Sequence, residues 1–367
     1  MTIADIEQIV ETWAPKWTAW ERDNVGLQLG DRTRKISKVL VALDVTEQIV
    51  QEARSKKVEL IVSHHPLLFR PPSSITTANE VGRMVLKLAE SKIAVYSAHT
   101  NVDFARDGVS FTLAKTLGLR SIRFLSPLKE TLAKVVVFVP AQFADSVADA
   151  MSSAGAGIIG NYLACSFQSK GTGTFCGSAQ TKPYAGKAGN RETVDEVRLE
   201  MIAPRARTND VIAAMKRVHP YEEVAYDLYH LDNEDPNYGM GAVGTLTTAQ
   251  SLKSFLERTK RVLHAASLCY SGDLRKQVKT VAVCGGSGSD LLSSAVNAKA
   301  DVFVTADVRY HTFHEARTIA LVDAGHWETE RVILEPLAAR LRQAATQMKK
   351  RLDVSVTKYS TNPIHTI

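Results

Sequence analysis

Histidine side chains follow two predicted strands of this sequence, and histidine is a common ligand of transition metals. His64 and His65 come directly after the apolar run Leu60–Ser63. His99 comes directly after a second apolar run, Ile93–Ala98. Because ligands of open α/β sheets gather outside the carboxyl ends of the strands, these imidazoles are expected to meet at one rim of a sheet.

The last third of the chain places carboxylates and another histidine in the same kind of position. Asp307 lies just beyond the predicted strand Asp301–Thr305. His326 lies just beyond the short predicted strand Leu321–Asp323. Glu330 is four residues further on, a spacing that brings both side chains to one side if a helix begins between them. Imidazoles and carboxylates together are a ligand set for Zn, Mn, Fe or Co.

The number of these groups favours two metal ions over one. Three imidazoles and two carboxylates suffice for two ions that share a bridging group. His64 and His65 are adjacent, so at a strand end they point apart and can serve two ions more easily than one. An isolated histidine at a strand end is more often a hydrogen-bonding or surface residue. The prediction of a metal site therefore depends on the groups acting together.

Alternating strands and helices must position these groups. In the first third, the predicted strands are Lys38–Val45, Leu60–Ser63 and Ile93–Ala98, and the helices are Thr46–Lys57, Asn79–Lys92 and Val109–Leu117. In the last third, the strands are Thr280–Cys284, Asp301–Thr305, Leu321–Asp323 and Leu352–Val356, with helices to about Ala298, through about Ala320, and from Thr329 to Lys350. This order predicts an α/β core with a parallel-type sheet flanked by helices.

The middle of the chain has a different order of elements. Its predicted elements are strand Leu132–Val139, helix Phe143–Ala154, strands Leu163–Ser169 and Val197–Ile202, helix Thr208–Val218 and strand Val224–Leu231. This βαββαβ order is typical of a ferredoxin-like α+β domain. We therefore predict a core split in sequence, residues 1–127 and 234–367, with an inserted domain at 128–233.

Composition excludes several classes of protein. Of the 367 residues, 45% are hydrophobic and 23% are charged, which is typical of a globular chain. No apolar run reaches the roughly 18 residues of a membrane span, and the N-terminus does not resemble a signal peptide, so a cytoplasmic location is expected. The net charge of +6 fits an anionic small molecule. Nucleic acid is disfavoured because no basic run is interleaved with aromatic residues. The four cysteines lack CxxC spacing and are predicted to be core residues.

Five segments resemble one known family. HHPLLF (64–69), SAHTNVD (97–103), HPYEE (219–223), TADVRYH (305–311) and DAGHWETE (323–330) resemble the NIF-three-like family, whose members are called GTP cyclohydrolase I type 2 homologues. The match follows nearly the whole chain. It implies a dinuclear metal site made of His64, His65, Asp103, His326 and Glu330. It also implies a ring-shaped homohexamer and an insert similar to PII and CutA proteins.

Two segments depart from the family pattern. The family motif W-D-N-x-G-L is read here from Trp20 to Leu27, with two extra residues after the tryptophan. The family's TGD is Thr305-Ala306-Asp307, in which alanine replaces a glycine that would allow close backbone approach.

Two functions from different classes fit these features. In the first, the protein is a hydrolase in which two divalent ions lower the pKa of a shared water. Glu330 would bridge the ions, His99 or Asp307 would carry the proton, and the substrate would be a nucleotide-like or phosphorylated anion. In the second, the protein is a non-catalytic metal-binding regulator or scaffold whose PII-like domain senses a small molecule.

Two further motifs have alternative interpretations. The glycine-rich turn 285–288 follows a strand and precedes a helix, so its N–H groups could cradle a phosphate, or it could simply be a tight turn. His219, Glu222 and Glu223 could face a ligand, although a helix end with surface acids is the favoured interpretation.

Overall fold

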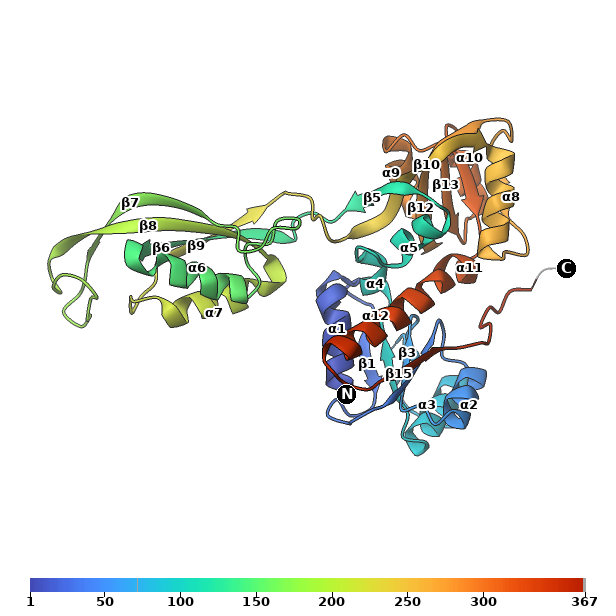
Figure 1. Ribbon diagram of the computed structural model, residues 1–367, viewed down its shortest axis with the longest axis horizontal. Coiled ribbons are helices and arrows are strands. Elements are labelled where there is room, and N and C mark those ends of the chain that lie inside the picture. The colour runs from blue at the N-terminus through green and yellow to red at the C-terminus, as the bar shows by residue number, and fades with distance from the viewer. Residues whose placement is uncertain (71, 366–367) are drawn as a thin grey trace. The chain divides into compact units, whose positions relative to one another are not determined.

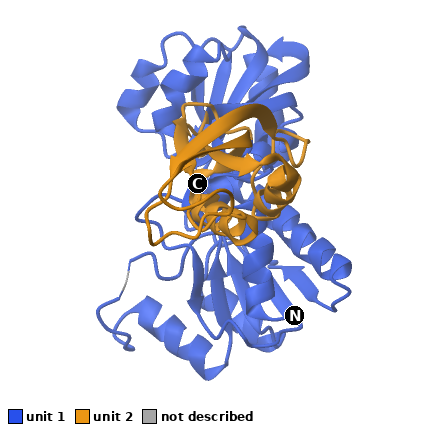
Figure 2. Cartoon of the chain, turned by 90° about the vertical axis from the view of Figure 1, so that its left-hand side faces the viewer, with its two compact units in different colours: residues 1–126, 237–367 blue, residues 127–236 orange. Residues whose placement is uncertain are grey.

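The structure, a computed structural model, describes residues 1–70 and 72–365. The chain forms two compact units (Figure 2). The first unit is Met1–Ser126 with Asn237–Ile367, and the second is Pro127–Pro236. The insert predicted at residues 128–233 lies inside the second unit.

The first sheet of the first unit is built mainly from the N-terminal part of the chain. Its strand order is β1 (Gly26–Leu29), β4 (Ala94–Ser97), β3 (Leu60–Ser63), β2 (Lys38–Ala42) and β15 (Asp353–Val356). β4, β3, β2 and β15 are parallel, and β1 is antiparallel to its neighbour β4. β2, β3 and β4 are short, largely apolar runs, as expected for strands covered on both faces, whereas the edge strand β15 alternates polar and apolar residues.

Helices cover both faces of this sheet. α1 (Ile3–Trp13) and α12 (Leu334–Gln347) pack on the side of Val39 and Val41. α2 (Glu47–Ser55) and α3 (Glu80–Glu90) pack on the side of Leu40 and Ala42. Successive strand residues therefore serve opposite cores, which follows from the two-residue repeat of a strand.

The second sheet of the first unit comes mainly from the C-terminal part. Its order is β11 (Cys269–Ser271), β14 (Ala320–Asp323), β13 (Val302–Ala306), β12 (Gln277–Ser287), β10 (Gly239–Ser251) and β5 (Arg120–Pro127). β12, β13 and β14 are parallel, whereas β10 and β11 run antiparallel to their neighbours β12 and β14. α5 (Val109–Thr116) and α8 (Leu252–Leu263) cover one face, and α9 (Leu292–Asn297) and α10 (Tyr310–Glu315) cover the other (Figure 1).

The core thus has two mixed sheets, and the prediction of one parallel-type sheet is wrong. Each sheet contains parallel strands of the expected kind, but the first sheet also has the antiparallel edge strand β1, and the second has the antiparallel strands β10 and β11, as is common in α/β proteins. The βα pattern of the sequence identifies a parallel centre without saying how many sheets the strands form. The return of β15 to β2 and the antiparallel partners are long-range pairings that local sequence does not encode.

Two predicted helices are also corrected. The helix expected from Thr329 to Lys350 is broken into α11 (His326–Glu330), a 3-10 turn at Arg331–Ile333 and α12. The helix expected through about Ala320 ends at Glu315, because Ala320 begins β14. The first break lets Glu330 face the interior, where its side chain is buried.

The second unit has the predicted βαββαβ order. Its elements are β6 (Leu132–Pro140), α6 (Ala144–Ser153), β7 (Phe167–Cys176), β8 (Arg191–Pro204), α7 (Thr208–Val218) and β9 (Tyr226–Leu231). The sheet order is β7-β8-β6-β9, with every pair antiparallel. The strand predicted at Leu163–Ser169 begins instead at Phe167, because ten residues of this polar, glycine-containing segment pair with β8.

The cysteines are less uniform than predicted. Cys284 is buried and Cys165 is half-buried, but Cys176 and Cys269 are exposed, so the prediction of core positions is wrong for the last two. Among the described residues, no helix combines the length and apolar character that a membrane crossing requires.

Removing the insert should leave a folded core. Residues 127–236 form their own unit, and β5 and β10, which precede and follow them, are neighbours in one sheet. A short Gly/Ser linker from Ser126 to Asn237 is therefore expected to preserve the circular dichroism spectrum per residue of the core and its metal binding. Insoluble or metal-free products with every linker length tried would contradict the independence of the two units.

Candidate metal centre

Four imidazoles of the first unit converge on one region. His64 and His65 follow β3, His99 precedes the short helix α4 (Thr100–Phe104), and His326 begins α11. Two groups could hold a metal ion, with one donor atom of each residue within 4.8 Å of the others. One group is His64, His65 and His99, and the other is His65, His326 and Glu330. His65 belongs to both groups. Because His65 follows β3 and His326 follows β14, the carboxyl ends of parallel strands from both sheets meet at this site.

Three of these imidazoles contact a carboxylate through Nδ1. The Nδ1 atoms of His65, His99 and His326 lie 2.7, 2.9 and 2.6 Å from oxygens of Asp44, Asp23 and Asp307, respectively. An ionised carboxylate accepts hydrogen bonds and cannot donate them, so the Nδ1 atom that faces it carries the proton. Nε2 then carries the lone pair, which is how most metal-binding histidines are oriented.

The fourth imidazole is held by the backbone. His64 Nδ1 lies 2.8 Å from the carbonyl oxygen of Ala98, at the end of the neighbouring strand β4. Burial lowers the pKa of His64 to about 3, with further contributions from the nearby histidines. His64 is therefore neutral at physiological pH, which is the form that binds metals.

Glu330 reaches the middle of the histidines. Its Oε2 atom lies 2.9 Å from His65 Nε2, 3.1 Å from His326 Nε2 and 3.8 Å from His64 Nε2. The four-residue spacing of His326 and Glu330 brings the two side chains together because α11 includes both residues. This agrees with the arrangement expected from the sequence.

Several donor atoms of the site are buried without a hydrogen-bond partner among the described residues. They are His64 Nε2, Asp103 Oδ1 and Glu330 Oε2. The first two lie 3.6 Å apart, too far for a hydrogen bond. Leaving a buried polar atom unpaired costs about 1–3 kcal/mol. Glu330 Oε2 still has ionic contacts with His65 and His326, but His64 Nε2 and Asp103 Oδ1 have no such close contact, which indicates that something else binds them.

A divalent cation fits this donor set. Two ligands that are each about 2.1 Å from one ion at a tetrahedral angle lie roughly 3.4 Å apart. The distances from Glu330 Oε2 to the three imidazoles, 2.9 to 3.8 Å, bracket this value. Neutral imidazoles and carboxylates suit Zn, Mn, Fe or Co, and the donor set alone does not choose among them.

The pKa shifts of the site residues are also those expected of a cation site. Burial opposes protonation of His65 and His326, but their carboxylate neighbours outweigh it and raise the two pKa values to about 10 and about 9. Burial also opposes ionisation of Glu330, but contact with these imidazoles lowers its pKa. Burial and the nearby Glu330 raise the pKa of Asp103. A divalent cation can take the place of the imidazole protons, because ligating histidines must be neutral.

The five ligands that the family resemblance implies therefore lie together. They are His64, His65, Asp103, His326 and Glu330. His99 lies beside them, with its ring centroid 5.2 Å from His64 and 5.3 Å from His65. Asp307 lies 2.6 Å from Nδ1 of His326 and can therefore orient this ring, while its role as a proton carrier stays a prediction.

Asp307→Asn is expected to weaken metal binding. Loss of the carboxylate removes the preference for a proton on His326 Nδ1, and such partners typically contribute about 10–100-fold in metal affinity. Asp307 has a positive φ of 54°, which asparagine tolerates as well as aspartate, so the backbone should be unaffected. Metal titration would measure the change against Asp149→Asn, an exposed substitution in α6. Equal affinities in the two variants would remove Asp307 from the site.

Sequence reasoning missed Asp23 as a site residue. Asp23 accepts hydrogen bonds from the backbone N–H and the hydroxyl of Thr100 in addition to its contact with His99. Burial opposes its ionisation, but these bonds lower the pKa of Asp23 to about 2. The neighbouring Asn24 donates to the carbonyl of Leu68, so this segment also fixes the loop after His65. The signal was the family's W-D-N-x-G-L motif, in which Asp23 was not considered.

The glycine-rich turn 285–288 leaves space for the side chain of Glu330. The N–H groups of Gly285, Gly286 and Gly288 donate to the hydroxyls of Ser110, Thr329 and Thr305, respectively. They are thus already used, which argues against a phosphate cradle. Gly286 has a φ of +63°, and a Cβ there would lie 2.0 Å from Glu330 Oε1.

Other predicted candidates lie elsewhere. The rings of His311 and His314 in α10 contact Tyr310. His219 caps the end of α7 in the second unit and bonds the carbonyl of Phe138 through Nε2 at 3.0 Å. This agrees with the favoured interpretation of that segment as a helix end.

Residues 1–363 match the model of Duf34/NIF3 (NGG1p interacting factor 3). The chain belongs to the Duf34/NIF3 family. A relative from Halalkalibacterium halodurans, called GTP cyclohydrolase 1 type 2 homolog, is 41% identical over 359 residues, which cover 97% of this chain and 96% of the relative.

Two solved structures are similar to this chain over its whole length. The chain is similar to a Bacillus cereus protein related to NIF3, with a TM-score of 0.87 and 39% identity over 100% of this chain and 99% of that one. It is also similar to Staphylococcus aureus protein SA1388, with a TM-score of 0.82 and 30% identity over 100% and 99% of the two chains.

Proposed function

We propose that this NIF3 protein is a hydrolase that uses two divalent metal ions per chain. The observation that carries the proposal is the set of buried donor atoms on His64, Asp103 and Glu330 beside two donor groups that share His65. Divalent ions bound there would act as Lewis acids and lower the pKa of water to near neutrality.

The protein residues would hold and orient this centre. His64, His65, Asp103, His326 and Glu330 would hold the ions. Glu330 would lie between the two groups, since its Oε2 approaches histidines of both. His99 has its Nδ1 proton fixed by Asp23, so its other nitrogen can accept a proton or act as a ligand of the first group.

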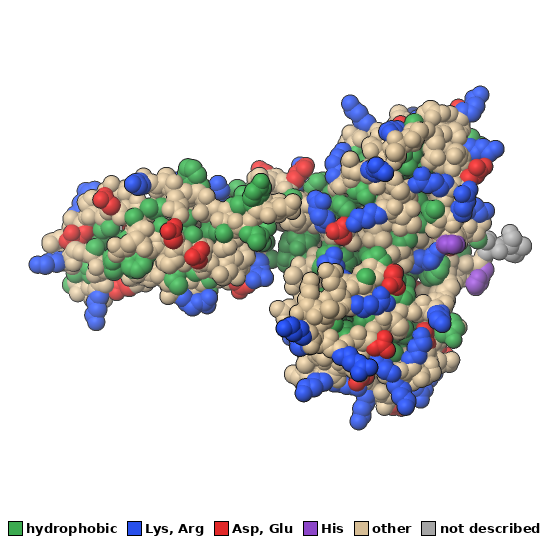
Figure 3. Space-filling model, viewed as in Figure 1, with side chains coloured by type: hydrophobic (Ala, Val, Ile, Leu, Met, Phe, Trp, Pro, Cys, Tyr) green, Lys and Arg blue, Asp and Glu red, His purple; other side chains and the backbone are tan. Residues whose placement is uncertain are grey.

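An anionic, nucleotide-like or phosphorylated substrate suits the protein best. The net charge of +6 favours anions, and the name of the Halalkalibacterium relative points to guanine nucleotide chemistry. On the face shown in Figure 3, Lys and Arg side chains are scattered among Asp and Glu and do not form a stripe. A stripe is typical of nucleic-acid binders, so a small molecule is the better candidate.

The second candidate is a metal-binding regulator or scaffold. It is favoured by the second unit, which contributes no residue to the metal groups and has its own core of Val135, Val137, Leu199 and Met201. A unit of this kind can bind a small molecule or a partner without taking part in any reaction.

A turnover screen separates the two candidates. Protein loaded separately with Zn, Mn, Fe or Co would be assayed with GTP, other nucleotides and phosphoesters. The proposal expects metal-dependent hydrolysis that falls at least tenfold, or about 1.4 kcal/mol in the barrier, in Glu330→Gln. This variant keeps the size of the side chain, and its metal content would be measured in parallel. Absence of metal-dependent turnover with every loaded form would favour the regulator.

A further inference from the structure

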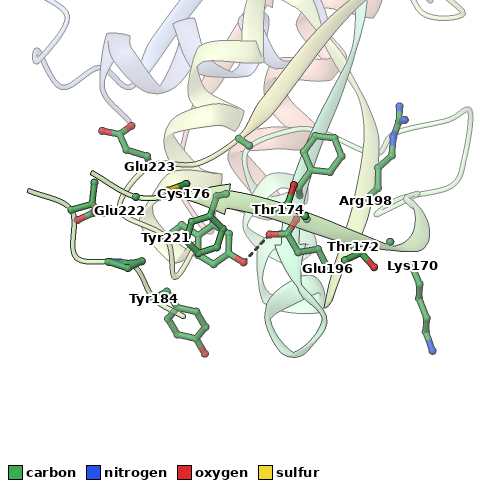
Figure 4. A pocket seen from close by; sticks show the side chains of 18 of the residues that line it. Lys170, Thr172, Thr174, Cys176, Tyr184, Glu196, Arg198, Tyr221, Glu222 and Glu223 are labelled. Atoms are coloured by element: carbon green, nitrogen blue, oxygen red, sulfur yellow. Dashed lines mark hydrogen bonds between the residues drawn. The ribbon is translucent and has the colours of Figure 1, made fainter. Parts of the chain in front are cut away.

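The second unit contains a cavity of about 630 Å³. It lies between β7, β8, the segment 177–184 and the turn Tyr221–Glu223 that follows α7 (Figure 4). This volume is within the range of roughly 300–1,000 Å³ typical of small-molecule sites. No residue that lines it belongs to the metal centre, so the cavity needs an explanation of its own.

Four aromatic side chains line the cavity. Phe138, Phe175, Tyr184 and Tyr221 line it. The rings of Tyr184 and Tyr221 are 5.9 Å apart, and the hydroxyl of Tyr184 accepts a hydrogen bond of 2.7 Å from Gln142. Rings fixed in this way offer a large apolar surface to a planar ligand.

A carboxylate and a guanidinium from the same strand both line the cavity. Glu196 and Arg198 are two residues apart on β8, so they share one face of the sheet at a Cα separation of roughly 7 Å. One oxygen of Glu196 accepts a hydrogen bond of 2.7 Å from Tyr221, drawn as a dashed line in Figure 4. Arg198 Nε lies 2.9 Å from Glu200, and the terminal nitrogens make no hydrogen bond with a described residue.

Glycine leaves the cavity open at this point. Gly171 on β7 lies directly opposite Glu196. A Cβ built on Gly171 would meet no atom within 4 Å, and its backbone is not left-handed. A larger side chain at this position would therefore fill the cavity without a clash, which makes Gly171 a suitable position for testing the site.

We propose that this cavity binds a small amphoteric molecule with an aromatic body and adjacent ammonium and carboxylate groups, of which an aromatic amino acid is the simplest example. The ammonium group would bind Glu196, the carboxylate would bind Arg198, and the ring would pack on Phe175 and Tyr221. Pairing each charged group of the ligand with a side chain of opposite charge fixes the orientation of the ligand and adds affinity. The site is independent of the proposed hydrolase activity, because the two share no residue.

Three related probes test the two charges separately. L-tryptophan carries both charged groups, tryptamine lacks the carboxylate, and indole-3-propionate lacks the amine. Calorimetric or NMR titration of the full chain should show saturable binding of one tryptophan per chain. Both analogues should bind at least tenfold more weakly, because each leaves one charged side chain without its partner.

Variants locate the binding within this cavity. Gly171→Leu should abolish tryptophan binding, whereas Gln168→Leu, which adds the same side chain to β7 outside the cavity, should retain it. Arg198→Gln should weaken tryptophan but not tryptamine. Glu200 keeps its ion pair with Lys134 at 3.0 Å in this variant, so the unit should stay folded. Glu196→Gln should weaken tryptophan but not indole-3-propionate.

Three results would overturn the proposal. They are the absence of saturable tryptophan binding to the folded chain, binding that survives Gly171→Leu, and equal affinity for tryptophan and both analogues. Circular dichroism of each variant would establish that it is folded, so a loss of binding in Gly171→Leu beside a normal Gln168→Leu supports the site.

Discussion

Replacing His65 with alanine is expected to remove at least one of the two metal ions that we propose for each chain. His65 is the residue that belongs to both donor groups, and its Nε2 lies 2.9 Å from Glu330. Its loss takes a ligand from each group and leaves the Glu330 carboxylate with fewer positive neighbours. Elemental analysis of purified protein would give the ions bound per chain.

The control for this experiment is His230→Ala. His230 is exposed on β9 of the second unit and lies outside both donor groups, so this variant should keep full metal content. If His65→Ala and His230→Ala held the same number of ions as the parent, His65 would not be a ligand. A parent protein without metal, even after incubation with each divalent ion, would refute the metal centre itself.

Gly286→Ala is the second substitution with a large expected effect. The added methyl group would lie 2.0 Å from Glu330 Oε1, and such a contact forces either the strand or the carboxylate to move. The positive φ of 63° costs an alanine about 1 kcal/mol in addition. We expect lower thermal stability together with a loss of metal, because Glu330 can no longer remain between the histidines.

Gly160→Ala separates the clash from the backbone strain. Gly160 has a φ of +58°, and a Cβ there meets nothing within 4 Å. This variant should therefore lose only the stability that the backbone conformation costs, with normal metal content. Thermal unfolding and elemental analysis of both variants would measure the difference. A Gly286→Ala protein that resembles Gly160→Ala in both measurements would show that the close approach to Glu330 does not matter.

Local sequence patterns determined the secondary elements that carry the ligands. The strand predicted at Leu60–Ser63 and the helix predicted at Thr208–Val218 have the same bounds in the structure. These segments are recognisable because a strand buried on both faces is a continuous apolar run, and a helix buried on one face repeats apolar residues every three to four positions. The histidines at the strand ends were identifiable for the same reason, since the position of a strand end follows from the apolar run before it.

The four-residue spacing of His326 and Glu330 was also visible in the sequence, and a single helical turn brings the two side chains together. They did not locate β7, whose alternation of glycine and threonine lacks an apolar face. That strand forms because its backbone pairs with β8, an interaction that depends little on side-chain type.

Only the tertiary structure decided how the ligands are held and how many sheets carry them. Asp23 is 76 residues from His99 and Asp44 is 21 residues from His65, yet each bonds the ring nitrogen that faces away from Glu330 or the neighbouring histidines. Gly286, near the end of β12 in the six-stranded sheet, leaves space for the side chain of Glu330. Such contacts join segments that are distant in sequence, and no periodicity within either segment records them. They form where the carboxyl ends of the parallel strands of both sheets meet.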